Sequence, residues 1–331
     1  MSLPRLAKGA GGGALVLAAP WLATGSGLLT TSDAIVAALF VPVVCGLVLV
    51  MGYAGQISLG QNALYGLGAY GSAILTARHG WSPWTAMLAS AALSGLVALL
   101  VGLPTFRLRG HLLALATAGL GVIGYVIFKA APVTGGVEGL GGVPPLSVFG
   151  LSSTDSGQFL AIVWTFALAV LVLSRNLVAS RAGRALRAAG ASEVAARASG
   201  IDPLRWKLLV FVLAAVFASL SGSLYAAYVG FVSPSAFSLS VAIEVVVMAV
   251  VGGLRSVWGV PFGAFAVVAL NVALDRFIPS LVPSATGDFQ VIGFGLVLVL
   301  FLNLAPDGAS GVASALLRQL RVRRGAERGT A

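Results

Sequence analysis

The feature that most constrains this 331-residue chain is a succession of ten long apolar runs joined by short polar links. A helix needs about 20 mostly apolar residues to cross the hydrocarbon core of a bilayer. Lipid offers no hydrogen-bond partner to backbone N–H and C=O groups, so a spanning segment must satisfy them internally. The pattern therefore predicts an all-α polytopic membrane protein of about ten transmembrane helices. The runs fall near residues 10–29, 33–51, 57–77, 84–104, 111–131, 157–174, 207–229, 239–254, 257–278 and 289–305.

The composition agrees with this class and excludes others. Charged residues make up only 9% of the chain, whereas a soluble domain carries about 25%. The 43 glycines fit as well, because small residues let membrane helices approach closely. A net charge of +10 would suggest nucleic acid binding in a soluble protein, but in membrane proteins Lys and Arg collect in cytoplasmic loops. We therefore expect contact with membrane lipid and none with nucleic acid. We expect Cys45, the single cysteine, to be a small core residue.

The basic residues orient the predicted spans. With ten spans and a cytoplasmic N-terminus, 17 of the 20 Lys and Arg residues fall in cytoplasmic segments. Only Arg78, Lys129 and Arg276 remain outside, and shifting the frame by one span would destroy this asymmetry. Both termini are therefore expected in the cytoplasm. The expected parts are one transmembrane domain (1–305), with a cytoplasmic loop (175–206) and an external loop (132–156), and a basic cytoplasmic tail (306–331).

A glycine-rich segment follows the second apolar run. Residues 52–61 read GYAGQISLGQ, with three glycines and several hydrogen-bonding side chains at membrane depth. Irregular backbone at that depth must be buried in protein or line a watery path, so one interpretation is a broken helix beside a translocation path. The other interpretation is a tight helix crossing built on small residues. The candidate path or gate residues are Gly52, Gly55, Gln56, Ser58 and Gly60.

Glu244 is the one acidic residue in the predicted interior of a span, and it joins the path or gate candidates. A carboxylate at that depth is costly unless it is paired or hydrated, which makes it a candidate for function. The alternatives are a protonated carboxyl group or a structural hydrogen bond that supports the bundle.

The loop over 175–206 is rich in helix-forming residues. Ser192 is suited to cap a short helix over 193–199, and Gly200 is suited to end it. The apolar side chains of this helix are too small to insert strongly into lipid, so a groove of another protein suits it better. They are Val194, Ala195 and Ala198.

The sequence gives little support for enzyme chemistry. The glycine-rich segment over 134–144 lacks the Gly-Lys-Ser/Thr ending of a phosphate loop, and no Walker A sequence occurs. The two histidines, His79 and His111, belong to no recognisable metal or catalytic set. We therefore expect a chain that is not an enzyme and holds no cofactor or metal. In the external loop, the candidate docking or gate residues are Gly135, Gly136 and Gly139.

Six motifs, in order along the chain, are similar to those of branched-chain amino acid ABC permeases of the LivM type. The similarity extends from about residue 45 to residue 305, and it departs from the family pattern at Val137-Glu138, His111-Leu112 and Arg255. These departures weaken any transfer of substrate identity, because related permeases are thought to import urea, short amides or aromatic acids. The motifs lie at residues 52–60, 108–117, 134–140, 195–201, 240–244 and 252–259.

This resemblance implies the membrane-spanning permease subunit of a bacterial inner-membrane ABC importer. The substrate would be a branched-chain amino acid, or a related small amino acid or amide. The implied partners are a second permease of the LivH type, two cytoplasmic ATPase subunits that bind ATP and Mg, and a soluble substrate-binding protein outside. The loop would dock on the ATPase through Glu193, Ala195, Ala196 and Gly200, which resemble a Glu-Ala-Ala…Gly coupling loop.

Two other functions remain open at this point. An ion-coupled secondary transporter would use Glu244 as its proton or ion site, and it would need no separate ATPase. A membrane-embedded enzyme, such as an acyltransferase, would need a reactive His or Cys cluster near the interface, and the sequence offers none.

Overall fold

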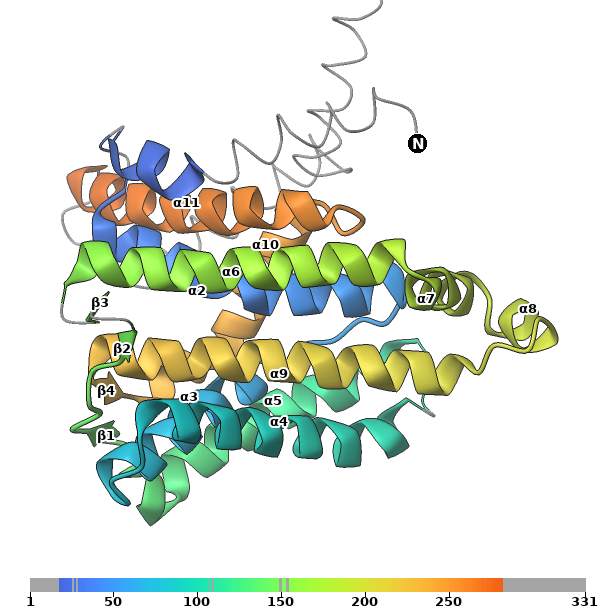
Figure 1. Cartoon of the computed structure of the whole chain (residues 1–331), viewed down its shortest axis with the longest axis horizontal. Helices are drawn as coiled ribbons and strands as arrows, with labels where there is room; N and C mark the ends of the chain where they lie inside the picture. The colour runs from blue at the N-terminus through green and yellow to red at the C-terminus, as the bar shows by residue number, and fades with distance from the viewer. Residues whose placement is uncertain are drawn as a thin grey trace, which may run out of the picture.

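The computed structural model describes residues 18–281 except 26, 28, 107, 109, 149, 150, 153 and 154. Its helices lie side by side in one bundle, with α7 and α8 projecting from one end and the short strands at the other (Figure 1). The tenth apolar run, 289–305, and the basic tail, 306–331, lie outside the described residues, as does half of the first run, 10–29.

The elements follow one another with short connections. The helices of the first half are α2 (Thr31–Val48), the π-helix η1 (Leu49–Tyr53), α3 (Gln61–Ala77), α4 (Pro83–Thr105), α5 (His111–Ala130) and the 3-10 helix η2 (Pro132–Thr134). Those of the second half are α6 (Ser156–Ala179), α7 (Arg181–Ala191), α8 (Glu193–Ala198), α9 (Pro203–Val229), η3 (Pro234–Phe237), α10 (Leu239–Gly252), η4 (Val257–Gly259) and α11 (Val260–Leu281). The strands are β1 (Leu140–Gly141), β2 (Ser147–Val148), β3 (Leu151–Ser152) and β4 (Phe231–Val232).

Eight of the ten predicted apolar runs correspond to helices, namely α2 to α6 and α9 to α11. In the described part of the chain, six helices are long and apolar enough to cross a membrane. The other two of the eight, α3 with 17 residues and α10 with 14, are shorter. Before α3, irregular backbone over residues 54–60 takes up the first part of the predicted run 57–77, whereas α10 starts where its predicted run starts and ends two residues early.

The helix α2 forms the centre of the bundle. In its span, Thr31–Tyr53, 83% of the most apolar window is buried inside the protein. It packs against α6, α9, α11 and α10. Its start is fixed by a capping box, in which Thr30 and Asp33 exchange hydrogen bonds between side chain and backbone.

Small residues bring α3 and α9 into close contact. A Cβ atom on Gly68 would overlap the backbone of Ser219, and one on Gly222 would overlap the carbonyl oxygen of Tyr65. Ser223 adds a hydrogen bond of 3.0 Å from its hydroxyl to the Gly68 carbonyl oxygen. This is how membrane helices pack where lipid removes the hydrophobic drive for association.

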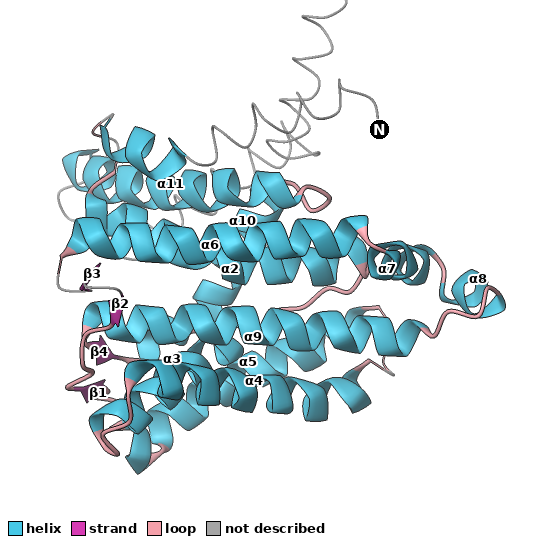
Figure 2. Ribbon diagram, in the orientation of Figure 1, coloured by secondary structure: helices cyan, strands magenta, loops and turns pink. Residues whose placement is uncertain are grey.

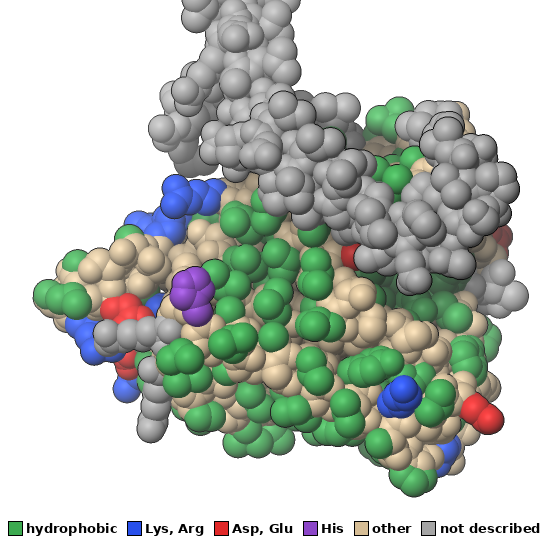
Figure 3. Space-filling view, turned by 180° about the vertical axis from the view of Figure 1, so that it is seen from behind, with side chains coloured by type: hydrophobic (Ala, Val, Ile, Leu, Met, Phe, Trp, Pro, Cys, Tyr) green, Lys and Arg blue, Asp and Glu red, His purple; other side chains and the backbone are tan. Residues whose placement is uncertain are grey.

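The rim of the bundle is apolar and faces outward. Only 22% of the span of α5 and 33% of that of α4 are buried. Figure 3 shows many hydrophobic side chains spread over the visible part of one face, as lipid contact requires. The exposed large side chains on these two helices include Leu96, Leu100, Leu115, Ile123 and Ile127.

The two ends of the bundle differ in charge and in structure. The seven basic residues between Arg175 and Lys207 belong to the end that carries α7 and α8, where Figure 3 shows Lys and Arg side chains gathered. The positive-inside rule predicts that this end faces the cytoplasm, and we call it the cytoplasmic end and the opposite one the external end. The strands mark the external end (Figure 2), where β1 pairs with β4 and β2 with β3, both antiparallel. The predicted loops over 175–206 and 132–156 therefore lie at opposite ends.

Candidate functional site

The helix α8 forms as the sequence predicts and lies at the tip of the cytoplasmic end. It covers Glu193–Ala198, one residue shorter than expected. The Ser192 hydroxyl oxygen accepts a hydrogen bond of 3.3 Å from the backbone N–H of Ala195, which caps the first turn. Gly200 has a positive φ of 76°, a conformation that few other residues adopt, and it turns the chain toward α9.

Most of the predicted docking face is free. The Val194 side chain is 81% exposed, and Ala195 and Ala198 are exposed as well. Ala196 is different, because it is buried, and its carbonyl oxygen accepts a 2.9 Å hydrogen bond from the backbone N–H of Ile201. Ala196 thus packs the helix against its own loop, while its three neighbours are presented outward.

Glu193 is held by an ion pair inside the chain. Its Oε1 atom lies 2.6 Å from the ammonium nitrogen of Lys207. This lysine lies in the first turns of α9 and is only 4% exposed. The Oε2 atom of Glu193 also lies 3.6 Å from the exposed Arg197 guanidinium. Sequence reasoning missed Lys207 as a functional residue, because it counted the lysine only among the cytoplasmic basic residues.

The start of the glycine-rich segment lies at the cytoplasmic end, where η1 is wedged between two other parts of the chain. A Cβ atom on Gly52 would overlap the carbonyl oxygen of Leu254, in the connection between α10 and α11. Gly55, with a φ of 67°, approaches the backbone of Gly190 in α7. The Tyr53 hydroxyl donates a 2.9 Å hydrogen bond to the Arg255 carbonyl oxygen.

This contact region, which we call the cytoplasmic junction, consists of residues 52–55, Gly190 and residues 254–255. A cavity of about 470 Å³ opens beside it and is also lined by Arg187. Gly52 and Gly55 therefore make the close backbone contacts that the second interpretation, tight packing on small residues, predicted. A π-helix such as η1 is rare and is found mostly at functional sites.

The second half of the segment is irregular backbone inside the bundle. Gln56 bonds locally, from its side-chain amide to the Gly55 carbonyl oxygen at 3.2 Å. Ser58 is buried, and the N–H of Leu59 donates to the Thr117 hydroxyl at 3.1 Å. Gly60 lies so close to the Thr117 carbonyl that a Cβ atom would not fit. The chain here is a broken helix against α5; its place beside a translocation path stays a prediction.

Two further polar residues, Gln61 and Asn62, follow at the start of α3. Both are 1% exposed. The Asn62 amide donates to the carbonyl oxygens of Phe237 at 3.0 Å, Ser238 at 3.3 Å and Gly121 at 3.3 Å. The sequence signal for them was weak, since Gln61 merely ended the glycine-rich motif and the partner of Asn62 lies 175 residues away.

Glu244 has a side-chain partner. The amide nitrogen of Asn271, on α11, donates a 3.4 Å hydrogen bond to its Oε1 atom, and both groups are partly buried. This contact joins α10 to α11. It matches the structural alternative that the sequence left open for Glu244.

The external loop is folded onto the bundle. Gly135, Gly136 and Gly139 all have positive φ, between 63° and 85°. A Cβ atom on Gly139 would overlap the Val232 carbonyl oxygen, next to the pairing of β1 with β4. These glycines therefore serve turns, and docking or gating by them stays a prediction.

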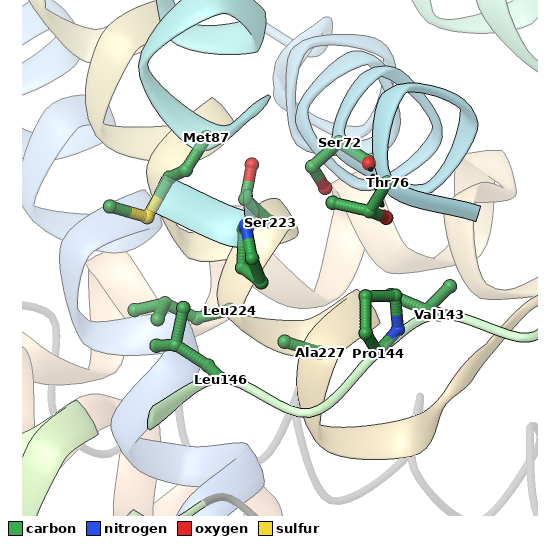
Figure 4. A pocket seen from close by; sticks show the side chains of 10 residues that line it. Ser72, Thr76, Met87, Val143, Pro144, Leu146, Ser223, Leu224 and Ala227 are labelled. Carbon is green, nitrogen blue, oxygen red and sulfur yellow. Dashed lines mark hydrogen bonds between the residues drawn. The ribbon is translucent and has the colours of Figure 1, made fainter. Parts of the chain in front are cut away.

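A small cavity lies under the external loop, between α3, α4 and α9 (Figure 4). It holds about 10 Å³, room for about one water molecule and too little for an amino acid. Its wall includes Thr76 and Ser223, whose hydroxyl groups bond to backbone within the bundle. This cavity is a packing gap.

Comparison with known proteins gives a consistent result. Residues 30–302 match the family described as "Branched-chain amino acid transport system / permease component". The chain is 29% identical over 308 residues to the high-affinity branched-chain amino acid transport system permease protein LivM of Escherichia coli K12. That alignment covers 86% of this chain and 70% of the relative. It is 30% identical over 287 residues to the LivM protein of Salmonella typhimurium LT2, covering 80% of this chain and 65% of that relative. No solved structure matches.

Proposed function

The chain belongs to the family of permease components of branched-chain amino acid transport systems, and we propose that it carries a branched-chain amino acid inward across the bacterial inner membrane. It is a multi-pass inner-membrane permease subunit of an ABC importer. The substrate class comes from the names of its relatives, so a related small amino acid or amide belongs to the same proposal.

The observation that carries the coupling part of the proposal is the exposed face of α8. A short helix that projects from the cytoplasmic end, with Val194 more than four-fifths exposed, offers an apolar knob to a protein groove. Two cytoplasmic ATPase subunits, which bind ATP and Mg, would receive this helix and its equivalent in a second, LivH-type permease. A soluble substrate-binding protein would deliver the substrate to the external loop. The chain itself would catalyse no reaction.

The structure offers two routes from α8 into the bundle. One is the Glu193–Lys207 ion pair, which joins the first residue of α8 to the base of α9. The other is α7, which through Gly190 meets η1, the continuation of α2, at the cytoplasmic junction. Because α9 and α2 are packed along much of the bundle, a displacement of α8 on the ATPase would shift the balance between inward-facing and outward-facing states.

The ion-coupled alternative finds no support. The partner of Glu244 is Asn271, a neutral amide, in a contact that joins two neighbouring helices. The family match and both relatives belong instead to transport systems with a separate permease component.

A reconstitution experiment tests the proposal. The native assembly is purified through a tag on this chain and reconstituted in liposomes. The binding protein is added on the external side of the membrane, and uptake of labelled leucine is measured. We expect uptake that requires ATP on the cytoplasmic face and that continues in the presence of a protonophore. Uptake driven by a proton gradient without ATP would favour the ion-coupled transporter instead.

Val194→Asp tests the docking face in the same preparation. A carboxylate on the exposed knob should release the ATPase subunits from the purified assembly and abolish uptake. His79→Asp, which adds the same charge at the external end, should retain the ATPase subunits. Equal retention of ATPase by both variants would show that α8 is not the docking element.

A further inference from the structure

The helix α3 begins inside the bundle, and the N-terminus of α10 lies next to its start. The helix α3 starts at Gln61 and runs toward the external end, where Arg78 follows it, while α10 starts at Leu239 and runs toward the cytoplasmic junction. The Asn62 amide bonds to the carbonyl oxygens of Phe237 and Ser238, the two residues directly before α10. The first turns of the two helices are therefore adjacent: that of α3 is buried, and that of α10 lies at the side of the bundle, with Leu239 39% exposed.

Neither N-terminus has a side-chain cap. Gly60 precedes α3 and Ser238 precedes α10, and neither accepts a hydrogen bond through a side chain from the turn that follows. In contrast, α2, α6 and α9 are capped by Thr30, Asp155 and Asp202. A helix N-terminus carries unpaired N–H groups and a partial positive charge. Two such ends close together make a place that attracts an anion.

Polar side chains without partners surround the same place. The hydroxyl oxygen of Ser58, both the Nε2 and Oε1 atoms of Gln61, and the Oδ1 atom of Asn62 are buried and have no hydrogen-bond partner among the described residues. The three residues are at most 2% exposed. A buried polar group left unpaired is costly in an apolar interior, so four such atoms within five residues indicate a ligand.

We propose that this junction of α3 and α10 binds the zwitterionic head group of the transported amino acid. The carboxylate would lie at the two helix N-termini and the Ser58 hydroxyl, and the ammonium group would donate to the free oxygens of Gln61 and Asn62. The inference rests on the proposed function and adds the contact that recognises an α-amino acid. It requires neither a charged side chain nor a metal.

Aromatic rings close this site toward the external end. The ring of Phe237 lies 5.3 Å from that of Tyr65 and 5.7 Å from that of Tyr70, between ring centroids, with Phe128 and Tyr225 completing the cluster. Gly121 and Gly124 of α5 press against Asn62 and Ala63 on another side. The site is thus closed in this structure, and substrate would enter when α5, the least buried of the six long spans, separates from α3.

The test uses Gln61→Leu in the complete assembly, with thermal stability and leucine uptake as separate readouts. Replacing an unpaired buried amide by an apolar group of similar size should keep or raise the melting temperature, because it removes an unsatisfied group. Leucine uptake should nevertheless fall by about tenfold or more, since the head group loses hydrogen bonds. Ser58→Ala should lower uptake in the same direction.

The matched control is Ser94→Ala, because Ser94 on α4 is also a buried serine whose hydroxyl has no partner among the described residues. It should leave uptake unchanged. Normal leucine uptake by both Gln61→Leu and Ser58→Ala would overturn the site while leaving the transporter assignment intact. If the wild-type assembly imports no amino acid at all, the proposed function fails first.

Discussion

At the residue scale, the pairing of Glu193 with Lys207 changes the role of the acid in the coupling loop. The sequence places Glu193 at the contact with the ATPase, but its Oε1 atom is 2.6 Å from a lysine that is almost fully buried. Removing one partner of a buried pair leaves an uncompensated charge, whereas removing both does not. Glu193 therefore links α8 to α9.

We predict that Glu193→Gln lowers the stability of the purified chain by about 3 kcal/mol, because the Lys207 ammonium group stays buried without its carboxylate. The double variant Glu193→Gln/Lys207→Met should regain stability, yet transport fewer substrate molecules per ATP hydrolysed, since the link is gone. Melting temperature and the ratio of uptake to ATP hydrolysis are the measurements.

Arg197→Gln is the control for this pair. Its guanidinium is 62% exposed and lies 3.6 Å from the same carboxylate, so its loss should cost about 0.5 kcal/mol or less. If the double variant transported as efficiently per ATP as the wild type, the ion pair would be a structural contact only.

Several residues show what a single sequence reveals and what it hides. Ser192 and Gly200 were predicted correctly, because a helix cap and a stop depend on neighbours within a few positions. The contacts of Lys207 and Asn62 were not predicted, since Glu193 is 14 positions from Lys207 and Phe237 is 175 positions from Asn62, and only the fold brings them close.

At the scale of elements, the glycine-rich segment divides into two parts with different roles. Its first half forms the cytoplasmic junction, where Gly52 touches the backbone before α11 and Gly55 touches α7. Its second half leads through the bundle interior to the uncapped start of α3. The sequence predicted irregular backbone and close packing as alternatives, and both are present, because a helix that breaks at depth must hide its backbone against neighbours.

We predict that Gly52→Ala destabilises the chain by about 1–3 kcal/mol, because the added methyl group must displace the Leu254 carbonyl. Gly119→Ala is the matched change. This glycine lies within α5 with nothing in reach of an added Cβ atom, so alanine should stabilise the helix by about 0.5–1 kcal/mol. Melting curves of the two variants in detergent would decide; equal melting temperatures would contradict the close approach at the junction.

Helix boundaries were predictable to different degrees. The ends of α4, α5 and α6 fall within a few residues of the predicted runs, because polar or glycine-rich links bracket each of them. The start of α3 at Gln61 was left open, since a broken helix over residues 52–61 was one of two interpretations, and the apolar run was predicted to begin at residue 57. Packing of residues 59–60 on α5 accompanies the irregular backbone there.

At the scale of the whole molecule, the fold separates two working ends and joins them through two central helices. The external end is closed by the folded loop and the aromatic cluster around Phe237, and the cytoplasmic end presents α8. Both α2 and α9 pass through the core. The cytoplasmic loop contacts α9 through Lys207, and through Gly190 it contacts η1, which continues α2. If an ATPase subunit binds α8 as we propose, its movement would reach the junction of α3 and α10 through these contacts, without a continuous rigid rod.

The orientation of the bundle supplies the last prediction. Every basic residue from Arg175 to Lys207 lies toward the α8 end, and the positive-inside rule places that end in the cytoplasm. In a Cys45→Ser background, Val137→Cys in the external loop, 68% exposed, should react with a membrane-impermeant maleimide in intact spheroplasts. Val194→Cys should react only after permeabilisation. The probe in the 175–206 loop is placed at position 194 because that side chain is exposed. Gly190, in the same loop, is packed against the Tyr53 carbonyl, and a side chain there would disturb the junction. Labelling of Val194→Cys from outside, at the rate seen for Val137→Cys, would show that the molecule has the opposite orientation. The α8 end would then face away from the cytoplasm, where the proposed ATPase subunits would be.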